Sequence, residues 1–96
     1  MRYIHVSWVH DDPDEPSELY SELDDGSWEV RKVEVFRGGR IGFAGPSEST
    51  GSTRLGLEPV PSLDEIALDP QFHPEEITRA EFERLWNSAC SVARAS

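Results

Sequence analysis

The chain has 96 residues, one cysteine and a formal net charge of −10, and these properties exclude several classes of protein. The length suffices for a single domain with one modest core, which we expect to span residues 1–96. A lone cysteine excludes an intrachain disulfide. The negative charge disfavours direct binding to nucleic acid or to an anionic membrane. The sequence shows neither the apolar run of a signal peptide nor that of a membrane span, so we expect a cytoplasmic protein.

The first half of the chain has the pattern of β-strands. Residues 3–10 alternate in two rows that both carry large side chains, which predicts a central strand covered on both faces. Residues 18–23 form a second expected strand, and residues 28–37 a third, with a change of phase near Arg31 that predicts a bulge. Gly38-Gly39 then predicts a hairpin turn into a fourth strand at residues 40–44.

The second half begins with residues 45–53, which are rich in Gly, Ser, Thr and Pro and are typical of a flexible loop or a binding loop. Two capping-box patterns, at residues 62–65 and 78–81, predict a short helix over 63–68 and a longer C-terminal helix. The longer helix carries an apolar stripe at helical spacing, made of Phe82, Leu85, Trp86, Ala89 and Val92. We therefore expect an α+β fold: a four-stranded antiparallel meander sheet with the C-terminal helix packed on one face and a short second helix.

Several segments carry a resemblance to a known family. They are Trp8-Val9-His10-Asp11-Asp12-Pro13, Leu19-Tyr20-Ser21-Glu22-Leu23-Asp24, Trp28-Glu29-Val30-Arg31-Lys32-Val33-Glu34-Val35-Phe36, Thr53-Arg54-Leu55-Gly56, and Ile77 with Glu81-Phe82-Glu83 and Trp86. Over roughly residues 1–89 the chain resembles a family of short, uncharacterised bacterial proteins catalogued as a domain of unknown function and common in actinobacteria and proteobacteria. This resemblance implies no activity. In class, rather than in motif, the chain is similar to small acidic immunity proteins, which neutralise toxins.

Acidic residues are concentrated in one stretch that no Lys or Arg interrupts. Its members are Asp11, Asp12, Asp14, Glu15, Glu18, Glu22, Asp24 and Asp25. We predict that these acids, together with Trp28, form the binding surface for a basic protein partner. A solvated acidic turn and a site for a hard cation are the alternatives. The spacing lacks the central Gly and the distant Glu of an EF-type loop, so we predict no metal site and no cofactor.

The residues suited to catalysis lack the setting that catalysis needs. His5, His10 and His73 have the chemistry of general acids and bases, but no Ser or Cys lies in a known nucleophile motif. We therefore predict no catalytic residue and expect that the protein is not an enzyme. Arg54 follows the 45–53 loop, and we expect it to anchor that loop by a bidentate contact to carboxylates.

These observations favour a small acidic protein-binding domain, an immunity- or antitoxin-like inhibitor that covers the basic cleft of a nucleic-acid-targeting toxin. The alternative is a small-molecule or peptide sensor in which residues 45–53 form a lid over the sheet, which requires a partly apolar pocket. A small enzyme with His10 beside a carboxylate is the third class considered.

Overall fold

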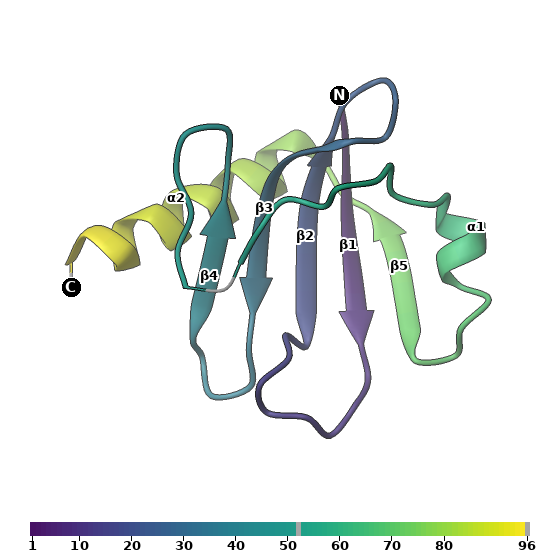
Figure 1. Cartoon of the computed structure of the whole chain (residues 1–96), viewed down its shortest axis with the longest axis horizontal. Helices are drawn as coiled ribbons and strands as arrows, with labels where there is room; N and C mark the ends of the chain where they lie inside the picture. Colours follow the sequence, from purple (N-terminus) through teal and green to yellow (C-terminus); the bar gives the residue numbers. More distant parts are fainter. Residues whose placement is uncertain (52, 96) are drawn as a thin grey trace.

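The computed structural model describes residues 1–51 and 53–95, so that Ser52, within the predicted loop, and Ser96 lie outside the described residues. An antiparallel sheet with the strand order β4-β3-β2-β1-β5 carries a C-terminal helix on one face (Figure 1). The elements are β1 Arg2–Trp8, β2 Glu18–Leu23, β3 Glu29–Val35, β4 Ile41–Ala44, α1 Leu63–Ile66, β5 Phe72–Glu76 and α2 Arg79–Ala95. The α+β class, the antiparallel sheet and both helices are confirmed. The predicted number of strands is wrong, because the described residues form five rather than four.

The additional strand, β5, lies at the edge of the sheet and pairs antiparallel with β1. Pro74 sits in its middle, opposite Val6. Flanking backbone hydrogen bonds run from Val9 N–H to the Gln71 carbonyl and from Ile77 N–H to the Tyr3 carbonyl. In an antiparallel pair the hydrogen-bonded positions alternate, so Pro74 points its nitrogen away from β1. A proline is tolerated there because an edge strand needs no donor on its outer side.

The sheet is covered on both faces, as the two rows of large side chains in β1 predicted. Tyr3 and Ile4 are neighbours in the strand, and both are buried. Tyr3 packs on Phe82 of α2 with 5.5 Å between the ring centroids. Ile4 belongs to a separate cluster on the opposite face, which Leu63 and Ile66 of α1 help to cover.

Helix α2 packs on one face of the sheet, where it contacts β1 to β4. Phe82 is fully buried, and Ala89 packs with Val33 and Phe43 in the cluster on this side of the sheet. Val92, the last member of the predicted stripe, is 57% exposed, so its assignment to the core is wrong. The reason is geometric, because the C-terminal end of α2 extends past the edge strand β4 (Figure 1).

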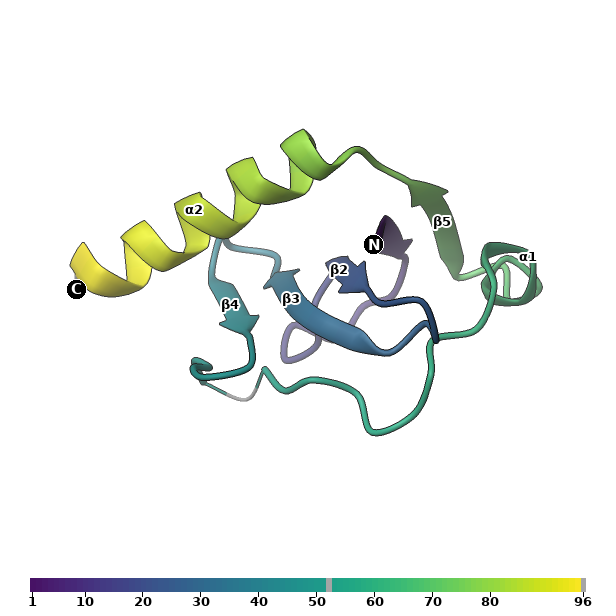
Figure 2. The same ribbon diagram turned by 90° about the horizontal axis from the view of Figure 1, so that it is seen from above.

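The chain between β4 and α1 runs along the face opposite α2 (Figure 2). Backbone and side-chain contacts fix it to the sheet: Gly56 N–H donates to Glu29 Oε1 at 2.6 Å, and Val60 N–H donates to the Ser27 carbonyl at 2.8 Å. Helix α1 begins with the predicted capping box, in which Ser62 Oγ accepts the Glu65 N–H at 3.2 Å. A four-residue helix and an extended segment therefore cover this face.

Candidate functional site

The loop between β1 and β2 is held in one shape by His10. Its Nε2 lies 2.8 Å from the Pro16 carbonyl, and its Nδ1 accepts the Asp12 N–H at 3.0 Å. A carbonyl only accepts and an N–H only donates, so a neutral ring with its proton on Nε2 satisfies both contacts. Asp12 Oδ1 in turn accepts the Asp14 N–H at 2.9 Å, which makes an Asx turn. The loop is ordered by its own side chains.

This loop presents four carboxylates to solvent, and we call them the acidic loop. They are Asp11, Asp12, Asp14 and Glu15. Among residues 1–51 and 53–95, no ion pair found in the structure involves any of the four. The acidic loop therefore carries a local charge that no ion pair compensates.

The other acids of the predicted run do not join the acidic loop. Glu18 is partly buried and accepts the Ser7 hydroxyl at 3.3 Å. Asp24 uses Oδ1 to accept the Gly26 and Trp28 N–H groups in the turn after β2. That turn lies at the opposite end of β2, roughly 20 Å away for a strand of this length, and it also holds the exposed Asp25 and Trp28, the latter 44% exposed.

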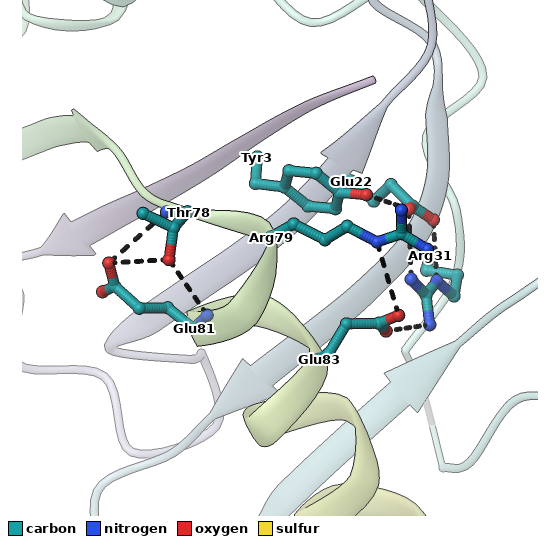
Figure 3. A network of polar contacts seen from close by, with 7 residues as sticks. All are labelled: Tyr3, Glu22, Arg31, Thr78, Arg79, Glu81 and Glu83. Carbon is teal, nitrogen blue, oxygen red and sulfur yellow. Dashed lines mark hydrogen bonds and ion pairs between the residues drawn. The ribbon is translucent and has the colours of Figure 1, made fainter.

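Glu22 was predicted to belong to the binding surface, but it is only 6% exposed and its carboxylate is engaged within the fold. Its Oε1 accepts Arg31 Nε at 2.7 Å, and its Oε2 accepts both Arg31 Nη2 and the Tyr3 hydroxyl (Figure 3). These hydrogen bonds from Arg31 hold the pKa of the Glu22 carboxyl below its ordinary value, although burial acts in the opposite direction. Glu22 therefore leaves the set of candidate contact residues.

Arg31 joins the sheet to α2 through the same network. Its Nη1 lies 2.7 Å from Glu83 Oε1, and Arg79 approaches the other oxygen of Glu83 from the first turn of the helix (Figure 3). The guanidinium also lies over the Phe82 and Trp86 rings, at 5.1 Å from each centroid. Figure 3 also shows the predicted capping box at Thr78 and Glu81. The network stabilises the helix–sheet contact and engages the Arg31 guanidinium within the fold.

A second polar cluster lies on the α2 side of the sheet, where β1, β2 and β5 run side by side. The His5 ring stacks on Tyr20 with 4.5 Å between centroids and an angle of 9°. One ring nitrogen lies 3.4 Å from Glu18 and the other 3.1 Å from Glu75. A cavity of about 380 Å³ opens beside them, with Arg84 and Leu85 of α2 on its other side. Burial, and then the charges of Glu18 and Glu75, raise the pKa of Tyr20, so its phenol stays protonated near neutral pH.

Sequence reasoning missed this cluster, because Glu75 belongs to the strand that was not predicted. It contains a histidine, but the neighbouring Ser7 hydroxyl donates to Glu18 rather than to His5. His10, the histidine expected beside a carboxylate, is occupied with backbone groups instead. His73 lies exposed on the edge strand β5.

The described part of the predicted 45–53 loop folds back on β4. Ala44 pairs with Ser49, and Thr50 N–H donates to the Phe43 carbonyl at 2.9 Å. Thr53 is buried, and its hydroxyl donates to Glu34 at 2.8 Å. Buried hydroxyls need such a partner, so Thr53 fixes the described end of the loop to β3.

Arg54 anchors the loop, although not through the expected carboxylates. Its Nη1 donates to the Thr53 carbonyl at 2.8 Å and to the Gly51 carbonyl at 3.0 Å, and it lies 3.4 Å from Ser49 Oγ. The loop folds so tightly around Arg54 that its own carbonyls are the acceptors within reach. Arg54 thus anchors the loop as expected, but through backbone carbonyls and the Ser49 hydroxyl instead of carboxylates.

One family model matches residues 2–91, and it is described as "Domain of unknown function (DUF6881)". The chain belongs to this family. The matched residues include the five strands, the acidic loop and most of α2. The resemblance stated from the sequence is thereby confirmed as membership of an uncharacterised domain family. No curated protein and no solved structure matches the chain.

No helix of the described chain is long and apolar enough to cross a membrane. Within the same residues, no group of three or more His, Cys, Asp or Glu side chains is arranged to hold a metal ion.

Proposed function

We propose that this protein binds a basic protein partner through its acidic loop. The observation that carries the proposal is the combination of four exposed, unpaired carboxylates with a loop that His10 and Asp12 hold in one shape. Fixed charges attract an oppositely charged partner without first being ordered, so the loop loses little conformational entropy on binding. Charge of this kind raises association rates more than it raises final affinity.

Apolar side chains beside the acidic loop supply the contacts that slow dissociation. Val9, immediately before the loop, is 59% exposed and is joined through its N–H to the Gln71 carbonyl. Leu68, in the turn that leads to β5, is 83% exposed. Burial of exposed apolar side chains in an interface is favourable, whereas charges at its rim mainly affect the association rate. The surface thus combines a steering charge with apolar contacts.

The class of partner follows from the charge. Rigid carboxylates on a chain of net charge −10 imitate the phosphates that a basic nucleic-acid-binding cleft recognises. We therefore propose an immunity- or antitoxin-like inhibitor whose target is a basic, nucleic-acid-targeting toxin. Such an inhibitor occupies the cleft itself and has no need to bind nucleic acid.

The basic turn between β3 and β4 lies at the same end of the sheet as the acidic loop (Figure 1). It carries the exposed residues Arg37 and Arg40, and Ser17 N–H joins this end of β2 to the Val35 carbonyl of β3. These two cations oppose the steering of a basic partner. Removal of these cations should therefore raise the association rate, whereas removal of the acids should lower it.

The test begins with the full chain as bait in lysate from its own source, at low and at high salt. The partner retained at low salt is then used to measure association rates with a variant that combines Asp11→Asn, Asp12→Asn, Asp14→Asn and Glu15→Gln. Asparagine at position 12 keeps the oxygen that accepts the Asp14 N–H, so the loop keeps its shape. We expect association to slow about tenfold or more.

A matched control removes the same amount of charge elsewhere on the surface. It combines Asp25→Asn, Glu48→Gln, Glu58→Gln and Asp64→Asn, all at exposed positions. Charges farther than a Debye length of about 8–10 Å from the interface are screened, so the rate should change less than about threefold. Arg37→Gln with Arg40→Gln should accelerate association. Equal rates for the two neutralised variants, or a partner retained unchanged at high salt, would contradict the proposal.

A further inference from the structure

A second site lies on the face of the sheet opposite α2. A pocket of about 330 Å³ opens between the sheet, α1 and the segment that precedes it. Its floor consists of the buried side chains Ile4 and Val6 of β1. Leu19 and Phe72 form its walls on the neighbouring strands. Ligand pockets in proteins generally have volumes of about 300–1,000 Å³ and apolar linings, so this pocket has the size and surface of a small-molecule site.

The fold itself keeps this pocket open. Helix α1 has four residues, and none of them is buried. It lies beside β5 at the edge of the sheet, while the chain that leads to it crosses β3, β2 and β1 as an extended segment (Figures 1 and 2). An extended segment places few side chains over the sheet beneath it. Val60 and Ile66 therefore stay half-buried at the margin of the pocket instead of filling it.

One end of the pocket is polar, but its polar groups already have hydrogen-bond and ion-pair partners within the fold. Ser21 Oγ donates to Glu29 Oε2 at 2.9 Å. Glu29 Oε1 accepts the Gly56 N–H and pairs with Lys32 Nζ at 3.0 Å. The charge of Glu29 is thereby balanced within the fold. A ligand gains nothing from a charged group at this end.

The other margin carries negative charge. Glu65 and Asp69 line the pocket there, and both are exposed. No Lys, Arg or His lies among the lining residues that the structure describes. A carboxylate or phosphate ligand would meet these acids with like charge, whereas an ammonium group would be attracted to them. A second copy of the chain fits poorly, since two acidic margins would face each other.

We propose that this pocket binds a small organic amine, with its apolar body on Ile4, Val6 and Leu19 and its ammonium group at Glu65 and Asp69. The function differs from partner binding by the acidic loop and uses other residues. The pocket also lies under the 60–72 segment rather than under the 45–53 loop, so a sensor of this kind needs no lid from that loop.

The test compares three probes with the same tail: octylamine, octanol and octanoate. The ¹⁵N-labelled full chain is titrated with each, and dissociation constants are taken from amide shifts at Ile4, Val6 and Leu19. We expect octylamine to bind up to about fivefold more tightly than octanol, because an exposed ion contact contributes at most about 1 kcal/mol. Octanoate should bind more weakly than octanol.

Adsorption of any amine to an acidic protein is the effect to separate from pocket binding. Butylamine carries the same charge on a shorter tail, so it should bind the pocket at least tenfold more weakly than octylamine, since each buried methylene is worth about 0.8 kcal/mol. Equal shifts with both amines, centred on Asp11 and Asp14, would overturn the proposal. So would the absence of binding by octylamine at millimolar concentration.

Variants locate the body and the head of the ligand. Leu19→Trp fills the pocket and should abolish octylamine binding, while Val92→Trp on the exposed side of α2 should leave it unchanged. If Leu19→Trp does not fold, Ile66→Trp fills the same space from α1. Glu65→Gln with Asp69→Asn should make octylamine and octanol bind equally, and Glu48→Gln with Glu58→Gln should not. Undiminished octylamine binding by a folded pocket-filling variant would also overturn the proposal.

Discussion

Replacement of Glu22 by glutamine should destabilise the protein strongly, although glutamine has nearly the same shape. The carboxylate accepts three hydrogen bonds, two from Arg31 and one from Tyr3, in a position that is 6% exposed. Removal of one partner of a buried ion pair costs about 3–5 kcal/mol. Arg31 keeps its contact with Glu83 at 2.7 Å, so we expect about 3 kcal/mol, the lower end of that range.

Chemical denaturation at pH 7 measures this loss, and thermal unfolding should show a fall in Tm of roughly 12–24 °C. Glu83→Gln is the matched control, because it removes a charge from the same guanidinium at a position where the side chain is 34% exposed. A partly exposed pair of this kind contributes less than a buried one, about 1 kcal/mol. The contrast between the two variants isolates the effect of burial.

The pH dependence of the free energy of unfolding tests the same prediction independently. The pKa of Glu22 is lowered on folding from its ordinary value of 4.5, so its contribution to stability is present above pH 4.5 and is lost as the pH falls through the lowered value. Glutamine does not titrate. The difference in the free energy of unfolding between the wild type and Glu22→Gln should therefore be constant above pH 5 and should shrink in acid. A loss below about 1 kcal/mol at pH 7, or a difference that widens in acid, would refute this reasoning.

Two further substitutions test local parts of the fold. Gly42→Ala should lower the free energy of unfolding by about 1–3 kcal/mol, because the added Cβ meets the Thr53 hydroxyl. In a double-mutant cycle followed by urea denaturation, Thr53→Ala in the same chain should recover part of that loss. Strictly additive effects of the two substitutions would contradict the contact. His10→Ala should cost about 1–2 kcal/mol and accelerate amide hydrogen exchange at Asp12, while His73→Ala should do neither. Unchanged exchange at Asp12 would show that His10 does not order the loop.

Local patterns in the sequence were sufficient for most of the fold. Alternation located β1 to β4, and the capping boxes at Ser62 and Thr78 located both helices. The strand β5 escaped because Pro74 interrupts a five-residue segment. A proline weakens the prediction of a strand unless the segment is known to lie at an edge, and edge position is a property of the assembled sheet.

The candidate site was less predictable, because charge density along a chain is not charge density on a surface. Glu22 lies on the face of β2 that α2 covers, beside Arg31 of the adjacent strand. Alternation shows which residues share a face, but the sequence does not say which face the helix covers. The positions of Asp24 and Asp25 at the far end of β2 likewise follow from where the strand ends.

The predicted surface is consequently smaller and better defined than the acidic run that suggested it. Four of the eight acids remain together in one loop, and this loop is the segment that His10 and Asp12 hold in shape. A scattered charge attracts a partner without orienting it, whereas fixed charges at one end of the sheet favour a particular approach. In the proposed complex the basic turn at Arg37 and Arg40 restricts the approach further, because it repels a basic partner. The ordered loop, rather than the net charge of −10, is therefore the feature on which the proposed recognition depends.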